Sequence, residues 1–205
     1  MINRVLIRLK VVQIVYAYYK NSGKSLKAAE DEMFFSLSKA YDLYSYLLLL
    51  MPGVTHYAAD RISFLSMKVR PTESDRNPNL KFVENRFIAQ LEQIEQLVKF
   101  SEKSKLNWVD NSDFLRRLLD KIEESDTYKE YMASGESSYA EDRELWRKLY
   151  KEFVFENEEL DDLIEEHSLY WNDDKAIVDT FVLKTIKRFS EDADSDTLLL
   201  PEYKD

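Results

Sequence analysis

The sequence predicts an all-α fold, a bundle of several helices, and three observations support this prediction. Apolar residues recur every three or four positions over most of the 205 residues, which is the spacing of one face of a helix. The chain has only three glycines and four prolines, too few for the many tight turns of an all-β protein. Hydrophobic residues make up 44% of the chain and aromatic residues 13%, which is enough for a sizeable core.

The first expected helix covers residues 2–19, and its side chains are apolar on most sides. A helix of this kind is expected to be buried over most of its surface. Ser25 is the expected N-cap of a second helix, which runs from residue 26 to about residue 51. Pro52 and Gly53 then predict a break or a sharp kink, because proline lacks the backbone donor that a helix needs. One long kinked helix through this point is the alternative.

Residues 70–80 are the clearest loop, with two prolines and two asparagines among polar residues. We interpret this loop as a solvated connector. The alternative is that it directs Arg70 and Arg76 toward the same ligand as the first helix. After the loop, apolar spacing predicts further helices over residues 82–100, 108–125, 139–155, 158–167 and 173–189.

Three regions are expected along the chain. Residues 1–105 form an N-terminal helical region that contains the basic first helix, and residues 106–190 form a second helical region. Residues 191–205 form an acidic tail that is expected to be flexible, because it has too little apolar surface to offset the cost of ordering. The similar runs FLRRLL at 114–119 and LWRKLY at 145–150 indicate a duplicated or inserted helical middle segment, or equally two ordinary amphipathic helices.

Charge is distributed unevenly along the chain. Residues 1–28 contain six Lys or Arg and no Asp or Glu, whereas the whole chain has a net charge of −10. Residues 29–205 therefore sum to −16. This asymmetry predicts a basic contact surface on an otherwise acidic protein, and the simpler interpretation is that the six cations only aid solubility.

The first helix contains a short motif, in which Arg4 and Arg8 are followed by the run VQIVY at 12–16. This motif resembles the opening of the NusB family, whose members are small all-helical RNA-binding factors. Three later stretches are similar to the longer NusB-like proteins of Bacteroidetes-type bacteria. They are FFSLSKAYDLYSYLLLLM at 34–51, NPNLKFVENRFIAQL at 77–91 and the segment 139–189.

The resemblance implies a NusB-like bundle that binds the boxA element of ribosomal leader RNA and pairs with the ribosomal protein NusE in transcription antitermination. It implies that the second helical region corresponds to the NusB core. The expected RNA-binding residues are Arg4, Arg8, Lys10, Gln13 and Tyr16. Of these, the arginines would contact phosphates, while Gln13 and Tyr16 would offer stacking or base-edge contacts to single-stranded RNA.

The chain departs from the family pattern in two places. Val5 and Leu6 stand where a basic residue is often found, which reduces the expected number of phosphate contacts. The distal segment of the family, with its NEAVELAK-like helix and FVNGVLD run, is not found after residues 171–189. We therefore expect either a fragment of a longer NusB-like protein or a shortened relative. A helical protein-interaction module without RNA affinity of its own is the alternative function.

No catalytic, metal-binding or cofactor-binding motif is found. The chain has no cysteine, and His56 and His167 have no partners at the spacing of metal ligands. The run NSGKS at 21–25 does not match a phosphate-binding loop, and the carboxylates at 158–166 are interpreted as a solvated helix face. The longest apolar run, 46–52, is far shorter than the roughly 20 residues of a membrane span. We expect a cytoplasmic protein that is not an enzyme and that uses no metal, no cofactor and no membrane.

Overall fold

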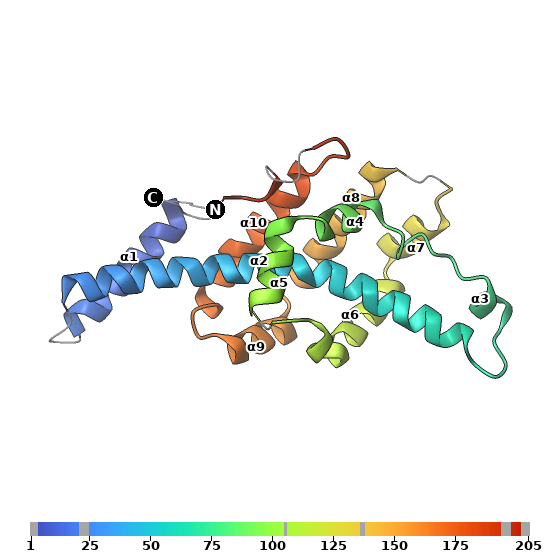
Figure 1. Cartoon of the computed structure of the whole chain (residues 1–205), viewed down its shortest axis with the longest axis horizontal. Helices are drawn as coiled ribbons and strands as arrows, with labels where there is room; N and C mark the ends of the chain where they lie inside the picture. The colour runs from blue at the N-terminus through green and yellow to red at the C-terminus, as the bar shows by residue number, and fades with distance from the viewer. Residues whose placement is uncertain (1–3, 21–24, 105, 136–137, 194–197, 202–205) are drawn as a thin grey trace.

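The computed structural model describes residues 4–20, 25–104, 106–135, 138–193 and 198–201. Within these ranges the chain forms ten α-helices and no strand (Figure 1). The prediction of an all-α, multi-helix fold is therefore confirmed. The helices in chain order are α1 (Arg4–Lys20), α2 (Leu26–Ser66), α3 (Glu73–Arg76), α4 (Arg86–Glu92), α5 (Glu95–Ser104), α6 (Ser112–Glu124), α7 (Asp126–Ala133), α8 (Tyr139–Leu149), α9 (Glu158–His167) and α10 (Lys175–Arg188). The 3-10 turns η1 (Val109–Asn111) and η3 (Asn172–Asp174) precede α6 and α10, and the π-helical turn η2 (Tyr150–Val154) continues α8.

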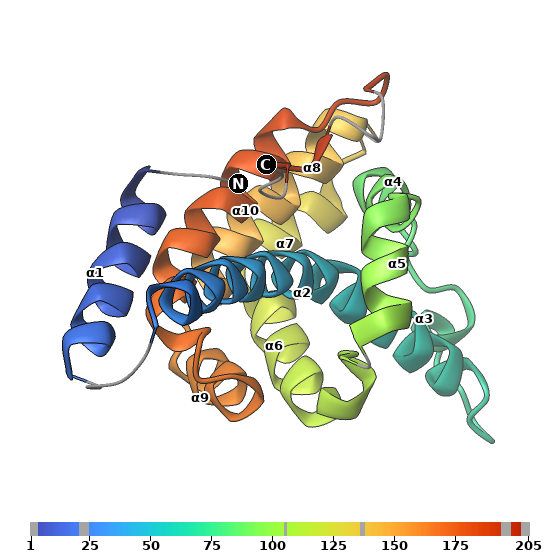
Figure 2. The same ribbon diagram turned by 60° about the vertical axis from the view of Figure 1, so that its left-hand side comes forward.

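The long helix α2 is the axis of the fold, and α1, α4, α5, α6 and α10 all pack against it (Figure 2). Its 41 residues span about 60 Å. Ser25 caps its start as predicted, because the Ser25 hydroxyl oxygen accepts a hydrogen bond from the Ala28 amide at 3.1 Å. The other residues of the predicted turn, 21–24, lie outside the described part of the chain. Nearly every side chain over residues 43–54 is buried, so this part of α2 is enclosed by other helices.

The predicted break at Pro52 is wrong, and the alternative of one long helix holds, since α2 continues through Pro52 and Gly53. Proline removes one backbone donor and costs a helix about 3 kcal/mol in an isolated setting. Here the residues around Pro52 are buried against neighbouring helices, so tertiary packing outweighs this local cost. The Thr55 hydroxyl also donates to the Met51 carbonyl at 3.0 Å, close to the proline.

The single helix predicted over residues 82–100 is also wrong, since this segment forms two helices, α4 and α5. Asn85 begins α4, because its side-chain oxygen accepts a hydrogen bond from the Ile88 amide at 3.0 Å. Gln93 ends α4, with its amide bonded back to the Gln90 carbonyl at 3.1 Å. Both helices pack against α2, and α4 also packs against α8.

The predicted loop at 70–80 contains the short helix α3. A capping box starts it: the Asp75 amide donates to the Thr72 hydroxyl at 3.2 Å, and the Thr72 amide donates to the Asp75 carboxylate at 2.8 Å. The remaining predicted helices appear as α6, α8, α9 and α10. The bounds of α9 match the prediction. Those of α6, α8 and α10 differ from it by a few residues, because 3-10 turns precede α6 and α10 and a π-helical turn follows α8.

Two tryptophans from the second half of the chain hold the middle of α2. The Trp108 ring stacks on the Tyr46 ring, with 4.2 Å between ring centres, and its indole N–H donates to the Tyr46 carbonyl at 2.9 Å. The Trp171 ring stacks on Tyr46 at 5.5 Å, and its indole N–H donates to the Lys39 carbonyl at 2.8 Å. The core therefore includes residues from both predicted helical regions.

Part of the predicted acidic tail packs into this core. Leu198 and Leu199 are buried, and the Leu200 amide donates to the Tyr44 hydroxyl at 3.1 Å. The tail residues 194–197 and 202–205 lie outside the described part of the chain. The described leucines are therefore held against α2 even though the tail is acidic.

The substitution Gly53→Ala is expected to lower the free energy of unfolding by about 1 kcal/mol. A Cβ atom on Gly53 would lie 3.0 Å from the Trp108 Cβ, and the stacked, hydrogen-bonded Trp108 ring has little room to move. Overpacking of this kind costs about 1–3 kcal/mol, and the higher helix propensity of alanine returns at most about 1 kcal/mol. Urea unfolding followed by tryptophan fluorescence measures the change.

The matched control for this experiment is Gly135→Ala. A Cβ atom on Gly135 would meet no atom within 4 Å, so this substitution should leave stability nearly unchanged. Equal stability of the two variants would contradict the close packing between α2 and Trp108.

Candidate functional site on the first helix

The outermost helix is α1, which lies along the first part of α2 at one end of the molecule (Figure 2). Its buried residues are Leu6 and Lys10. The expectation that its apolar side chains would be covered on most sides is therefore wrong. The helix packs along one side only, so several of its valines and tyrosines are exposed.

A buried ion pair holds α1 against the start of α10. The Lys10 ammonium lies 2.6 Å from a carboxylate oxygen of Asp174, and the two side chains are 3% and 0% exposed. Burial is the largest influence on the Asp174 carboxyl and raises its pKa, while the contact with Lys10 acts in the opposite direction. Both charges are removed from water, so the loss of either side chain would leave the other charge buried without a counter-charge.

A second polar contact lies one turn further along α1. The Gln13 side-chain amide donates to the Asp173 carboxylate at 2.9 Å. Lys10 and Gln13 therefore both face η3, the turn that contains the two aspartates. The sequence predicts both residues as RNA contacts, yet in the structure their polar atoms bind the protein's own carboxylates.

The opposite side of α1 is exposed, and we call it the outer face. Residues three, four and seven positions apart lie on the same side of a helix, which places these side chains together. Val12, Tyr16 and Tyr19 are 67%, 63% and 80% exposed. The outer face consists of Arg4, Val5, Arg8, Val12, Val15, Tyr16 and Tyr19.

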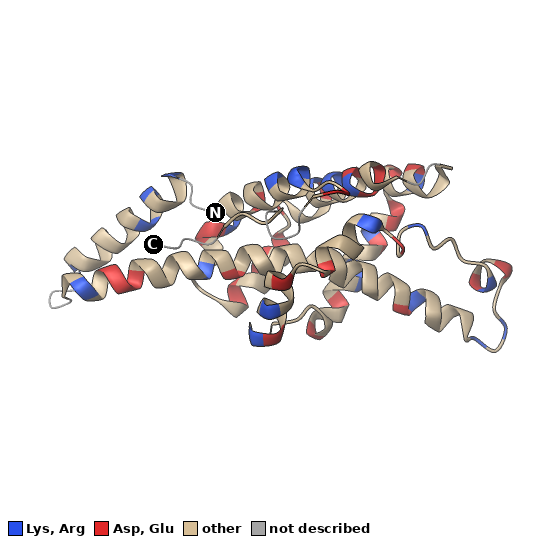
Figure 3. Cartoon of the chain, turned by 45° about the horizontal axis from the view of Figure 1, so that its top comes forward, with Lys and Arg blue, Asp and Glu red and all other residues tan. Residues whose placement is uncertain are grey.

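The outer face is basic at its N-terminal half and aromatic at its C-terminal half. No Asp or Glu is present in α1, whereas the adjoining first turns of α2 carry Glu30, Asp31 and Glu32 (Figure 3). The Lys20 ammonium lies 5.6 Å from the centre of the Tyr16 ring, which is within the range of a cation–π contact. The structure thus brings together Arg4, Arg8 and Tyr16 of the predicted RNA-binding set.

Arg70 and Arg76 lie at the other end of the molecule. Arg76 belongs to α3, which packs near the C-terminal end of α2, whereas α1 lies along its N-terminal part (Figure 1). Most of the length of α2 separates the two regions. The structure therefore does not bring these arginines to the ligand of the first helix.

A second group of buried titratable residues surrounds Lys175. Its ammonium lies 2.9 Å from the Asp179 carboxylate and 3.1 Å from the Asp161 carboxylate, and it donates to the Val154 carbonyl at 3.2 Å. The Tyr150 hydroxyl donates to the other Asp179 oxygen at 2.7 Å, and burial raises the pKa of both Tyr150 and Asp179. The group therefore joins η2, α9 and α10.

The acidic pair in η3 is the part of the site that sequence reasoning missed. Asp173 is 160 residues from Gln13 in the sequence, and no local pattern links the two. One signal could have been used: a lysine on the inward side of an apolar helix needs a carboxylate partner, and α1 has none of its own.

Two searches of the described residues give no further site. They contain no group of three or more His, Asp or Glu placed to hold a metal ion. None of the described helices is long and apolar enough to cross a membrane.

Comparisons of the chain with protein-family models, with curated proteins and with solved structures find no match. Function must therefore be inferred from the outer face of α1 and from the sequence motif that lies on it.

The substitution Lys10→Met is expected to lower the free energy of unfolding by about 3 kcal/mol, because it leaves the Asp174 carboxylate buried without a partner. The double substitution of Lys10→Met with Asp174→Leu should recover most of this loss, since no buried charge remains. Urea unfolding followed by circular dichroism measures the three proteins. Lys20→Met is the control, because it removes an exposed lysine of the same helix.

The loss in Lys10→Met should also shrink as the pH is lowered from neutrality. In the unmodified protein the contact with Lys10 acts against the rise that burial causes in the Asp174 pKa, whereas in Lys10→Met this opposing contact is lost. The folded variant therefore binds a proton more readily than the unmodified protein does, and it gains more stability as pH falls. A loss that equals that of Lys20→Met, or that grows at lower pH, would show that the ion pair does not hold α1.

Proposed function

We propose that this chain is a NusB-like RNA-binding protein of transcription antitermination, and that it binds single-stranded RNA on the outer face of α1. The observation that supports this proposal most strongly is the exposure of Arg4, Arg8 and Tyr16 on one side of a helix that has no carboxylate. Arginines supply the phosphate contacts that dominate RNA affinity, and exposed aromatic rings stack on unpaired bases.

The order of these groups along α1 suits an extended strand. Arg4 and Arg8 are one turn apart, about 6 Å along the axis, and Tyr16 follows about 12 Å beyond Arg8. A strand that follows the helix would place phosphates against the arginines and bases against Tyr16 and Tyr19. The ammonium of Lys20 beside Tyr16 adds a further cation at the aromatic end.

Lys10 and Gln13 have a different part in this proposal. Their contacts with Asp174 and Asp173 fix the rotation of α1 about its axis, which is what turns the arginines and Tyr16 outward. They act as positioning residues, and the RNA contacts fall to the side chains of the outer face.

The partner and the setting follow from the resemblance of the motif at residues 4–16. Within this proposal the protein works without catalysis, in the cytoplasm, beside a ribosomal protein of the NusE type. The RNA is of the boxA kind.

A second candidate function has its own observation. Val5, Val12 and Val15 occupy the same face as the arginines, and aliphatic side chains have no chemistry for RNA. Exposed apolar side chains on a helix are typical of a surface that packs against another protein. The alternative is therefore a protein-interaction module that contacts a partner through α1 and has no RNA affinity of its own.

The double substitution Arg4→Ala with Arg8→Ala tests the proposal. It should weaken binding to a boxA-like single-stranded RNA several-fold, because two phosphate contacts are lost. Each such contact contributes about 0.7 to the slope of log affinity against log salt for a single strand, so the slope should fall by about 1.4. Fluorescence anisotropy at several salt concentrations, with a scrambled RNA alongside, measures both quantities.

The matched control removes the same charge from the other end of the molecule, with Arg70→Ala and Arg76→Ala. It should leave both the affinity and the slope unchanged, since these residues lie far from α1. Equal effects of the two double substitutions would reject the outer face as the RNA site. Absence of RNA binding by the unmodified chain, with retained binding to a NusE-type protein, would favour the protein-interaction module.

A further inference from the structure

A groove follows the second half of α2, away from α1. It consists of two adjoining hollows of about 310 Å³ and 390 Å³. The first lies between α2 and α5, and the second lies between α2 and the start of α6. Gly53, His56 and Val109 line both hollows, so the two form one continuous depression.

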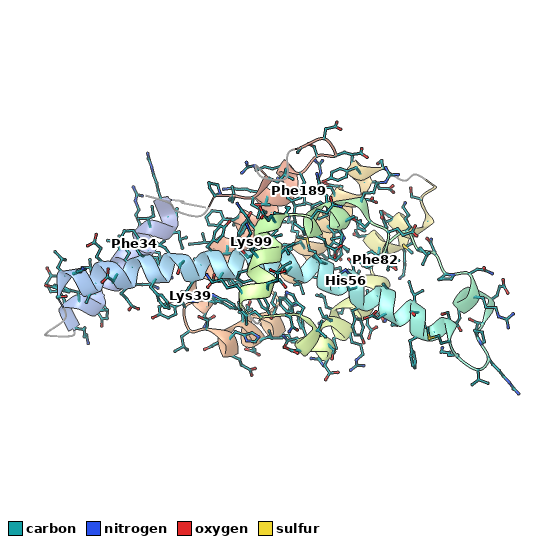
Figure 4. The ribbon with its side chains drawn as sticks, in the orientation of Figure 1. Phe34, Lys39, His56, Phe82, Lys99 and Phe189 are labelled. Carbon is teal, nitrogen blue, oxygen red and sulfur yellow. The ribbon has the colours of Figure 1, made fainter. Side chains whose placement is uncertain are left out.

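The groove exists because of how α5 is placed. The short helix α5 crosses α2 and does not lie alongside it, which leaves α2 uncovered beyond the crossing (Figures 1 and 2). Trp108 packs closely against Gly53 at the bottom of the depression, and His56 lies on α2 next to the crossing (Figure 4). The floor is rigid, because the Trp108 indole is stacked on Tyr46 and donates to its carbonyl.

The rim of the groove is apolar and exposed. Val98 of α5, Val109 of η1 and Phe64 of α2 all present large parts of their side chains to water, and Val109 is 78% exposed. Single exposed apolar side chains are normal on a protein surface, but here three of them surround one preformed depression.

The charged residues that line the groove are mostly carboxylates. Asp60, Glu92 and Glu102 lie in its walls, and the lining cation Arg61 is already bound by two further carboxylates, those of Asp120 at 2.8 Å and Glu123. The His56 imidazole lies 2.5 Å from the Glu92 carboxylate, between the two hollows. A positively charged ligand therefore suits this groove.

We propose that this groove binds a basic amphipathic helix of a partner protein. Two apolar side chains of that helix, one or two turns apart, enter the two hollows and cover Val109 and Phe64. Lysines or arginines on its flanks meet Asp60 and Glu102. This is helix-in-groove recognition, in which buried apolar anchors give affinity and flanking charges give selectivity.

The surface is separate from the outer face of α1 and does not depend on RNA binding. It would give the protein an attachment point to a second macromolecule while α1 holds RNA.

The test uses the full chain and a model peptide of about 16 residues, with leucines one and two turns apart and lysines at the other positions of its polar face. The chain has two histidines, His56 in the groove and His167 at the end of α9, so the readout is the imidazole proton signal of each in NMR. The expected result is that the peptide shifts the His56 signal in a saturable way and leaves the His167 signal in place. A peptide with the same leucines and glutamates for lysines should bind at least about tenfold more weakly, because it meets carboxylates of the same sign.

Two substitutions of matched chemistry locate the binding. Val109→Glu places a charge at the junction of the two hollows and should weaken binding of the lysine peptide about tenfold or more. Val69→Glu places the same charge on a residue that is 99% exposed and lies outside the groove lining, and it should leave binding unchanged. Both positions are exposed, so neither change should disturb folding.

Three outcomes would overturn the proposal. The first is that the lysine peptide does not shift the His56 signal, and the second is that the glutamate peptide binds more tightly than the lysine peptide. The third is that Val109→Glu and Val69→Glu lower the affinity for the lysine peptide equally. A His56 signal that moves with the concentration of the protein alone would assign the groove to a second copy of this chain, which also rejects a partner helix as its occupant.

Discussion

The burial of the middle of α2 on all sides determines where the other helices lie. A helix that is apolar around its whole circumference must be enclosed, and no single neighbour can do this. Helices from both halves of the chain therefore converge on residues 43–54, and the two tryptophans that stack on Tyr46 also bond to α2 carbonyls. This enclosure explains why Pro52 does not end the helix, because the surrounding contacts outweigh the loss of one backbone bond.

The two ends of α2 extend beyond this enclosed centre and are covered on fewer sides. At the N-terminal end α1 covers one side only, and most side chains of its own outer face are exposed. Apolar contact alone would allow α1 to rotate about its axis. The Lys10–Asp174 pair and the Gln13–Asp173 bond select one rotation, and that rotation directs Arg4 and Arg8 outward. A structural ion pair thus determines which residues α1 offers to a ligand.

The sequence predicted those parts of the fold that depend on local patterns. Apolar spacing located α2, α6, α8, α9 and α10, and Ser25 marked the start of α2. The two errors have different causes: at Pro52 tertiary packing outweighed the local signal, whereas within residues 82–100 the Asn85 cap and the turn at Gln93 begin and end a separate helix. Within the candidate site, the helical period places Arg4 and Arg8 on one side of α1, but the exposure of that side was not predicted, because the helix was expected to be buried over most of its surface. The burial of Lys10 could not be predicted, because its partner Asp174 lies in a turn that only the tertiary fold brings close.

The net charge of −10 bears directly on whether α1 can hold an anionic ligand. At physiological ionic strength, electrostatic interactions are screened over about 8 Å, so a phosphate at the outer face responds mainly to the side chains within that distance. There it meets Arg4, Arg8 and the ammonium beside Tyr16, while the carboxylates around the α2 groove lie far along the molecule. An acidic protein can therefore present a basic site, provided that its carboxylates stay away from that site. Asp173 and Asp174 are exceptions, but they lie on the inward side of the helix, where Lys10 offsets the charge of Asp174 and Gln13 donates a hydrogen bond to Asp173. The carboxylates Glu30, Asp31 and Glu32 adjoin α1 on the first turns of α2.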